Sequence, residues 1–125
     1  MATKTKKVEE KKTTLEWKGV EYSLVFNLNV MEQIQDEYGT IGEWGDMTDN
    51  AKEPNAKAVI FGLMCMLNEG IDIDNEENEG VEGYTPKKFL TKKQVGRLLT
   101  DVGIEEATQR LNDSVINAVA SDEKN

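Results

Sequence analysis

The sequence predicts a mainly α-helical domain with an N-terminal two-stranded β-hairpin packed on a bundle of about four to five helices. Three patterns predict this fold: alternating apolar residues around a Lys18-Gly19 turn, an uncharged run over residues 58–67, and apolar residues at helical spacing near the C-terminus. A chain of 125 residues has room for one domain. We expect it over residues 13–120, between a disordered basic arm over 1–12 and a frayed tail over 121–125.

The hairpin is predicted over residues 13–26, with Lys18 and Gly19 as a two-residue turn. This turn fixes which side chains lie opposite one another. The facing pairs are Trp17 with Val20, Leu15 with Tyr22, and Thr13 with Leu24. These mostly apolar side chains then share one face, and because a lone hairpin is barely stable, that face must pack on helices.

Two short helices are expected to follow the hairpin. The first begins at Asn27 or Asn29 and ends at Tyr38, because asparagine caps helix N-termini and Gly39 can adopt the left-handed terminating conformation. The second lies within residues 40–50, where apolar side chains recur every three residues. These side chains are Ile41, Trp44 and Met47.

The central helix is predicted from its apolar composition and its ends. Pro54 suits its first turn, Gly70 suits the position just after it, and Ala58–Leu67 contains no charge. A helix that is apolar all round is not a surface helix. Two interpretations stay open: the helix is buried on every side within its own domain, or part of it meets a partner.

The C-terminal half is predicted to contain a charged loop and two helices. Residues 71–84 form an acidic loop that faces the basic segment 85–97. Thr91, with a glutamine three residues on, begins the fourth helix as a capping box. Gly103 separates this helix from the fifth, over Ile104–Ala120. The apolar stripe of the fifth helix comprises Ile104, Ala107, Leu111, Val115 and Ala118 or Val119.

Catalytic and metal-binding chemistry is not evident in the sequence. The chain has no histidine, which removes the commonest general base and metal ligand, and its single cysteine, Cys65, lies among apolar residues. No phosphate-binding glycine motif is present. We therefore predict a protein that is not an enzyme, with no catalytic, cofactor-binding or metal residues and no cofactor.

An acidic calcium-binding loop is the nearest approach to a site motif. Asp72, Asp74 and Glu76 alternate as in an EF-hand, but Glu77 replaces the glycine at the sixth position and Gly83 the glutamate at the twelfth. An acidic cation-binding interaction module is therefore the weakest of the alternatives.

Composition excludes several classes of partner and location. The net charge of −9 argues against a nucleic-acid binder, because phosphate contacts need a basic surface. No run approaches the roughly 20 apolar residues that span a bilayer. A lone cysteine cannot form an intramolecular disulfide, which fits a cytoplasmic protein.

Several stretches resemble one protein family. Gly19-Val-Glu-Tyr-Ser-Leu-Val-Phe-Asn-Leu-Asn29, the helix begun by Leu90-Thr-Lys-Lys-Gln-Val-Gly-Arg-Leu-Leu99, and Ile104–Ala120 are similar to the tail assembly chaperones of long-tailed (siphovirus-type) bacteriophages and prophages. The similarity covers roughly residues 17–119 and consists of hydrophobic patterns. It implies a protein of the bacterial host cytoplasm that binds and solubilises the tape-measure protein, helps recruit tail-tube subunits and is absent from the mature virion.

A client-holding protein needs apolar surface on an acidic, soluble body. The candidate partner-binding residues are Trp17, Trp44, Val59, Leu63, Met64, Met66 and Leu67. The alternative for each of them is a place in the core, where such residues are more often found. The alternative from a different class is a structural phage tail or head–tail joining component. The sequence leaves homo-oligomerisation open.

Overall fold

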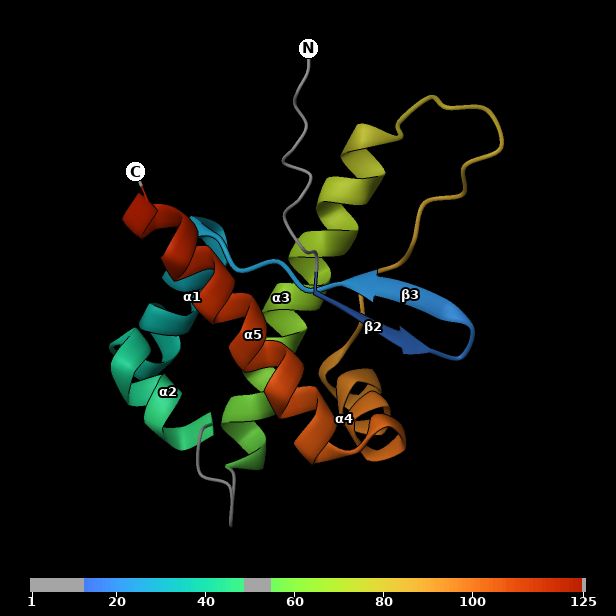
Figure 1. The fold of residues 1–125 in the computed structure, drawn as a ribbon. Helices are drawn as coiled ribbons and strands as arrows, with labels where there is room; N and C mark the ends of the chain where they lie inside the picture. The colour runs from blue at the N-terminus through green and yellow to red at the C-terminus, as the bar shows by residue number, and fades with distance from the viewer. Residues whose placement is uncertain (1–12, 49–54, 125) are drawn as a thin grey trace.

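A computed structural model describes residues 13–48 and 55–124 of the chain. Within these ranges the chain forms two strands and five helices (Figure 1). They are β2 (Thr14–Trp17), β3 (Val20–Ser23), α1 (Leu28–Tyr38), α2 (Ile41–Thr48), α3 (Ala56–Glu77), α4 (Lys92–Val102) and α5 (Ile104–Lys124). The predicted fold class, a mainly α-helical domain with an N-terminal hairpin packed on the helices, is confirmed. The predictions for the arm over 1–12 and for Pro54 lie outside the described residues.

The hairpin has the register that the turn predicts. Trp17 pairs with Val20 and Leu15 with Tyr22 in an antiparallel ladder. Lys18 and Gly19 both have positive φ, 53° and 79°, as a two-residue hairpin turn of this kind requires. Leu15, Trp17, Leu24 and Phe26 are buried, so the apolar face of the hairpin and the segment that follows it belong to the core.

Helix α1 begins at the first of its two candidate caps. The Asn27 side chain accepts a hydrogen bond from the backbone N–H of Val30 at 3.2 Å, and the helix ends before Gly39, whose φ is 97°. The short helix expected within residues 40–50 is α2. Its Trp44 points into the core and donates from Nε1 to the carbonyl oxygen of Ala58 at 3.0 Å.

Helix α3 runs through the middle of the molecule, and α1, α2, α4, α5 and β3 all pack against it (Figure 1). Its apolar side chains fill the core: Ala58, Val59, Leu63, Met66 and Leu67 are all inaccessible to solvent. On the uncharged run, Ile60, Phe61 and Met64 are only partly buried. Burial within its own domain therefore accounts for most of this apolar helix.

The prediction that Gly70 ends the central helix is wrong, and so is the loop predicted from residue 71. Helix α3 continues to Glu77, and Ile71 is buried in it. Gly70 serves another purpose: a Cβ there would lie 2.5 Å from the backbone oxygen of Ser23. The chain leaving β3 crosses α3 at this point, and the Met66 carbonyl accepts a hydrogen bond from the Val25 N–H at 3.3 Å. Glycine is needed for this close crossing.

The two C-terminal helices form as predicted, with two differences: Ile104, the first residue of the predicted apolar stripe, is 38% exposed, and α5 ends further along the chain. Thr91 caps α4 through the predicted capping box with Gln94, and Gly103, with φ 101°, ends it. Helix α5 extends to Lys124 rather than ending at Ala120. The buried Ser114 hydroxyl of α5 donates to the carbonyl oxygen of Leu24 at 3.1 Å, which ties this helix to the exit of the hairpin.

Among the described residues, none of the helices has the length and apolar character needed to cross a membrane.

Candidate functional site

Most of the candidate partner-binding residues lie inside the domain. The structure buries Trp17, Trp44, Val59, Leu63, Met66 and Leu67 in the core. Met64 alone of the seven is partly buried rather than buried. A partner could not reach the other six without opening the domain.

The two tryptophans use their polar atoms within the domain. Trp17 donates from Nε1 to a carboxylate oxygen of Asp101 at 2.8 Å, and the ammonium of Lys18 lies 5.0 Å from the centre of its rings. Trp44 donates to the backbone of α3, as described above. A buried indole N–H needs such an acceptor, so both side chains are placed as parts of the fold.

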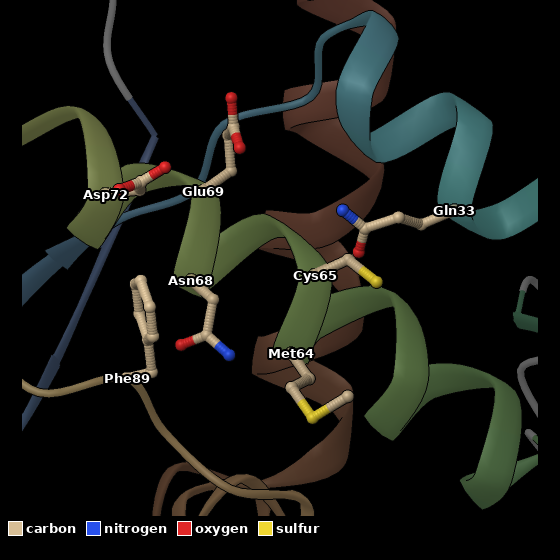
Figure 2. Close-up of a pocket in the computed structure, with 7 residues that line it drawn as sticks. All are labelled: Gln33, Met64, Cys65, Asn68, Glu69, Asp72 and Phe89. Atoms are coloured by element: carbon tan, nitrogen blue, oxygen red, sulfur yellow. The ribbon is translucent and has the colours of Figure 1, made fainter.

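Around Met64 the surface is hollowed between α1, α3 and the segment that leads into α4 (Figure 2). We call this feature the α1–α3 hollow; its volume is about 190 Å³. Its lining residues are Gln33, Met64, Cys65, Asn68, Glu69, Asp72 and Phe89. Gln33 comes from α1, Phe89 from the connecting segment, and the others from successive turns of α3.

The hollow has an apolar side and an acidic side. The Phe89 ring and the Met64 side chain lie towards one end, and the Glu69 and Asp72 carboxylates towards the other (Figure 2). Phe89 is 57% exposed, although it is large and aromatic. Asp72 is exposed and makes no hydrogen bond or ion pair with another described residue.

Two asparagines of α3 hold the connecting segment that carries Phe89. The Asn68 side chain donates to the carbonyl oxygen of Leu90 at 3.0 Å and accepts from its N–H at 2.8 Å. Asn75 does the same for Lys87, with both hydrogen bonds at 3.0 Å, and accepts from the Tyr84 hydroxyl at 2.6 Å. Because these asparagines are seven residues apart, they lie on one face of the helix. We call this pair the asparagine clamp.

Sequence reasoning missed both the clamp and Phe89. The spacing of Asn68 and Asn75 on one helix face was the available signal. The prediction of a loop over residues 71–84 concealed this signal, because it placed Asn75 outside the helix that contains Asn68. Helix α3 instead includes Asn75 and presents both side chains to residues 84–90.

The charges near the hollow are partly paired. Glu69 accepts hydrogen bonds from Asn27 at 2.8 Å and from Asn29 at 3.1 Å, which fixes the start of α1 against α3. The predicted approach of the acidic and basic segments is seen at one place, where the Lys87 ammonium lies 3.3 Å from the Asp74 carboxylate. Both side chains are about a third exposed, so this ion pair adds little stability.

Cys65 lies on the floor of the hollow with little exposure. Burial raises the pKa of its thiol to about 11, so the thiol stays protonated at neutral pH. A nucleophilic cysteine needs the opposite shift in pKa, because the thiolate is the reactive form. The residue therefore acts here as a small core side chain.

The acidic residues of the calcium-like pattern lie on a helix rather than in a loop. Asp72, Asp74 and Glu76 belong to the last two turns of α3. Asp72 and Glu76, four residues apart, share a helix face, but Asp74 lies between them on another face, so the three carboxylates cannot converge on one ion as they would in an EF-hand. In the described part of the chain, no group of three or more acidic or cysteine side chains is arranged to hold a metal ion.

Comparisons of the chain with family models, curated proteins and solved structures found no match. The hollow thus brings together an exposed aromatic ring, a partly buried thioether and two carboxylates, of which only Asp72 has no partner among the described residues.

Proposed function

We propose that this chain is a tail assembly chaperone of a long-tailed bacteriophage or prophage. In this role it works in the host cytoplasm, binds and solubilises the tape-measure protein, helps recruit tail-tube subunits and is left out of the mature virion. The resemblance of residues 17–119 to that family supplies the identity of the client. The support from the structure is an exposed apolar side chain held at the junction between the hairpin and α1.

The observation that carries the proposal is the construction of the junction from Phe26 to Asn29. Phe26 is buried and closes the hairpin core, while Asn27 and Asn29 both bind Glu69 of α3. Leu28, between these asparagines, is 77% exposed. The junction that carries the resemblance therefore holds an apolar side chain in solvent at a fixed place.

The surface as a whole suits a protein that holds an aggregation-prone client. Its net charge of −9 keeps it soluble, because like-charged molecules repel one another. Several large apolar side chains are nevertheless exposed on the described surface: Leu28, Met47, Val81, Phe89, Ile104 and Ile116. An exposed apolar side chain on an acidic body, such as Leu28 at the junction, allows client contact while the net charge disfavours self-association.

Co-expression with a tape-measure fragment from the same genome tests this function. The fragment alone should be insoluble; with the chain present it should move to the soluble fraction and co-purify with it. A fragment that stays insoluble, or is soluble without binding, contradicts the proposal. A soluble carrier protein of similar size and charge serves as the control for general effects of co-expression.

Mass spectrometry of purified virions separates the chaperone from a structural component. A chaperone is absent from the finished particle, whereas a tail or head–tail joining protein is present at fixed stoichiometry. Detection of the chain at such a copy number would replace the proposed function with the structural one.

A further inference from the structure

We propose that the α1–α3 hollow is where this chain holds its client, and that the client segment carries a bulky apolar side chain flanked by lysines or arginines. Calling the client a tape-measure protein rests on the proposed function. The apolar and basic character of the client segment is inferred from the hollow alone. It follows from the size of the hollow, the fixed position of Phe89 and the charge of the lining residues.

The apolar side of the hollow is suited to one large side chain. The hollow measures about 190 Å³ in all, with its polar lining included, and it is open to solvent, so a large side chain placed there would be covered only in part. Phe89 and Met64 are both partly open to solvent beside it. Aromatic and methionine side chains are enriched in protein interfaces, because each covers a large apolar area and methionine adapts to the shape of its partner.

The asparagine clamp gives the hollow a fixed wall. Four hydrogen bonds from the side chains of Asn68 and Asn75 hold the backbone at Lys87 and Leu90, on either side of Phe89. The backbone of Phe89 is thus positioned before any partner arrives. A partner then loses less free energy in ordering this segment on binding.

The charge of the surface selects a basic partner. A second, shallower hollow adjoins the first through the shared Gln33 and is lined by Glu32, Gln35 and Asp36 of α1. Among described residues, the two linings include four carboxylates and no basic side chain. Of the lysines beside Phe89 in the sequence, Lys87 is paired with Asp74, and Lys88 is exposed. A basic segment would therefore meet complementary charge on the α3 and α1 side of the hollow, at Glu69, Asp72 and the carboxylates of α1.

The same charges disfavour the other occupants of such a surface. A second copy of this chain would bring its own acidic surface to an acidic one, which is repulsive in a symmetric contact. Nucleic acid is repelled by the same carboxylates. A basic, apolar protein segment is the occupant that the lining favours.

The test uses the full chain and a synthetic helical peptide with leucines on one face and lysines on the other. Its control is the same peptide with glutamate in place of lysine. Binding is measured by fluorescence anisotropy of the labelled peptide. The lysine peptide should bind, the glutamate peptide should not, and the affinity should fall with added salt because the charges involved are exposed.

Two variants locate the peptide on the hollow. Phe89→Ser and Asp72→Lys should each weaken binding about tenfold, the effect of losing one anchor or reversing one nearby charge. Both side chains are exposed, so the fold should survive, and circular dichroism checks this. The matched controls on α5 are Ile116→Ser, at an exposed apolar residue, and Glu105→Lys, with the same change in net charge.

Several outcomes would overturn the proposal. If both peptides bind equally well, the charge of the hollow does not select the partner. If the α5 control variants weaken binding as much as the variants in the hollow, the peptide does not bind at the hollow. Sedimentation equilibrium examines the remaining occupant: a wild-type dimer that Phe89→Ser converts to a monomer means that a second copy covers the hollow instead.

Failure of this proposal can be told apart from failure of the proposed function. If the wild-type chain solubilises a tape-measure fragment and Phe89→Ser and Asp72→Lys do so equally well, the client is held elsewhere and the chaperone function stands. If the lysine peptide binds the hollow while the fragment stays insoluble, the hollow stands and the chaperone function fails.

Discussion

Replacement of Gly62 by alanine tests the packing of α2 on α3, because general helix propensity and the local structure predict opposite results. Gly62 lies within α3, where alanine normally stabilises a helix by about 1 kcal/mol over glycine. Here a Cβ would lie 2.3 Å from Cζ2 and 2.9 Å from Cε2 of the Trp44 indole. The indole is 1% exposed, so it is enclosed by the core and can move only by displacing its neighbours.

The expected magnitude follows from what the indole must give up. Overpacking a core by one methyl group costs about 1–3 kcal/mol. Displacing the ring also breaks the hydrogen bond from Trp44 to Ala58, and an unsatisfied buried donor costs about 1–3 kcal/mol. After the propensity gain is subtracted, Gly62→Ala should destabilise the domain by about 3 kcal/mol, which lowers Tm by about 10 °C.

Urea unfolding followed by circular dichroism and tryptophan fluorescence measures this change. Gly45→Ala is the matched control, since Gly45 lies in α2 beside Trp44 and no atom lies within 4 Å of a Cβ there. The control should leave the free energy of unfolding unchanged or raise it by up to about 1 kcal/mol. In a Trp44→Leu background, which removes the ring, Gly62→Ala should lose most of its destabilising effect.

A Gly62→Ala protein as stable as the Gly45→Ala control would refute the reasoning. That result would mean that the indole does not lie against α3 as the structure places it. An equal cost of Gly62→Ala in the wild-type and Trp44→Leu backgrounds would also refute it, because the clash would then come from another group.

Three further predictions concern other parts of the fold. Gly70→Ala should destabilise by at least about 2 kcal/mol in urea unfolding, because its Cβ would meet the Ser23 backbone oxygen at 2.5 Å. Asn75→Ala should leave the helices intact but speed limited proteolysis within residues 84–90, because the Lys87 backbone and the Tyr84 hydroxyl lose their hydrogen-bond partner. Unchanged cleavage would contradict the role of the asparagine clamp. The pKa of the Cys65 thiol is 9.0 in the unfolded chain and about 11 in the native protein. Between pH 9 and pH 11 the unfolded chain therefore releases a proton that the native protein keeps, so the free energy of unfolding should fall as pH rises. Unfolding measured across that range should show a smaller fall for Cys65→Ala, and equal slopes would contradict the buried thiol.

The parts of the fold that local chemistry decides could be predicted from the sequence. The Lys18-Gly19 turn sets the hairpin register, and the capping box at Thr91 sets the start of α4. Each of these signals involves residues within a few positions of one another. Their energetic preference is expressed before any tertiary contact forms, which is why reasoning from single residues succeeded there.

The end of α3 could not be predicted in the same way, because the role of Gly70 is tertiary. In sequence, a glycine after an apolar run has the appearance of a helix terminator. Position 70 must be glycine because the backbone of Ser23, 47 positions away in the sequence, crosses the helix there and leaves no room for a side chain. Misplacing this boundary also concealed the asparagine clamp, because Asn75 could not then be assigned to a helix face.

The candidate site was missed for a related reason. Apolar character drew attention to the uncharged run 58–67, yet the most apolar side chains are those that a small domain needs for its own core. Of the seven candidates, only Met64 borders the hollow. The exposed aromatic, Phe89, lies in a basic segment without hydrophobic periodicity, so no pattern distinguishes it from an ordinary linker residue.

Helix α3 turns one face to the core and another to the hollow, which has a consequence for function. The side chains that stabilise the domain, such as Leu63 and Met66, are distinct from those that line the hollow, such as Asp72. Changes at distant, unconnected sites are close to additive in free energy. Substitutions at Asp72 and Phe89 should therefore alter binding with little effect on unfolding, whereas Gly62→Ala should do the reverse at low temperature. This separation would let residues of the hollow be changed while the hairpin and the helix core are kept.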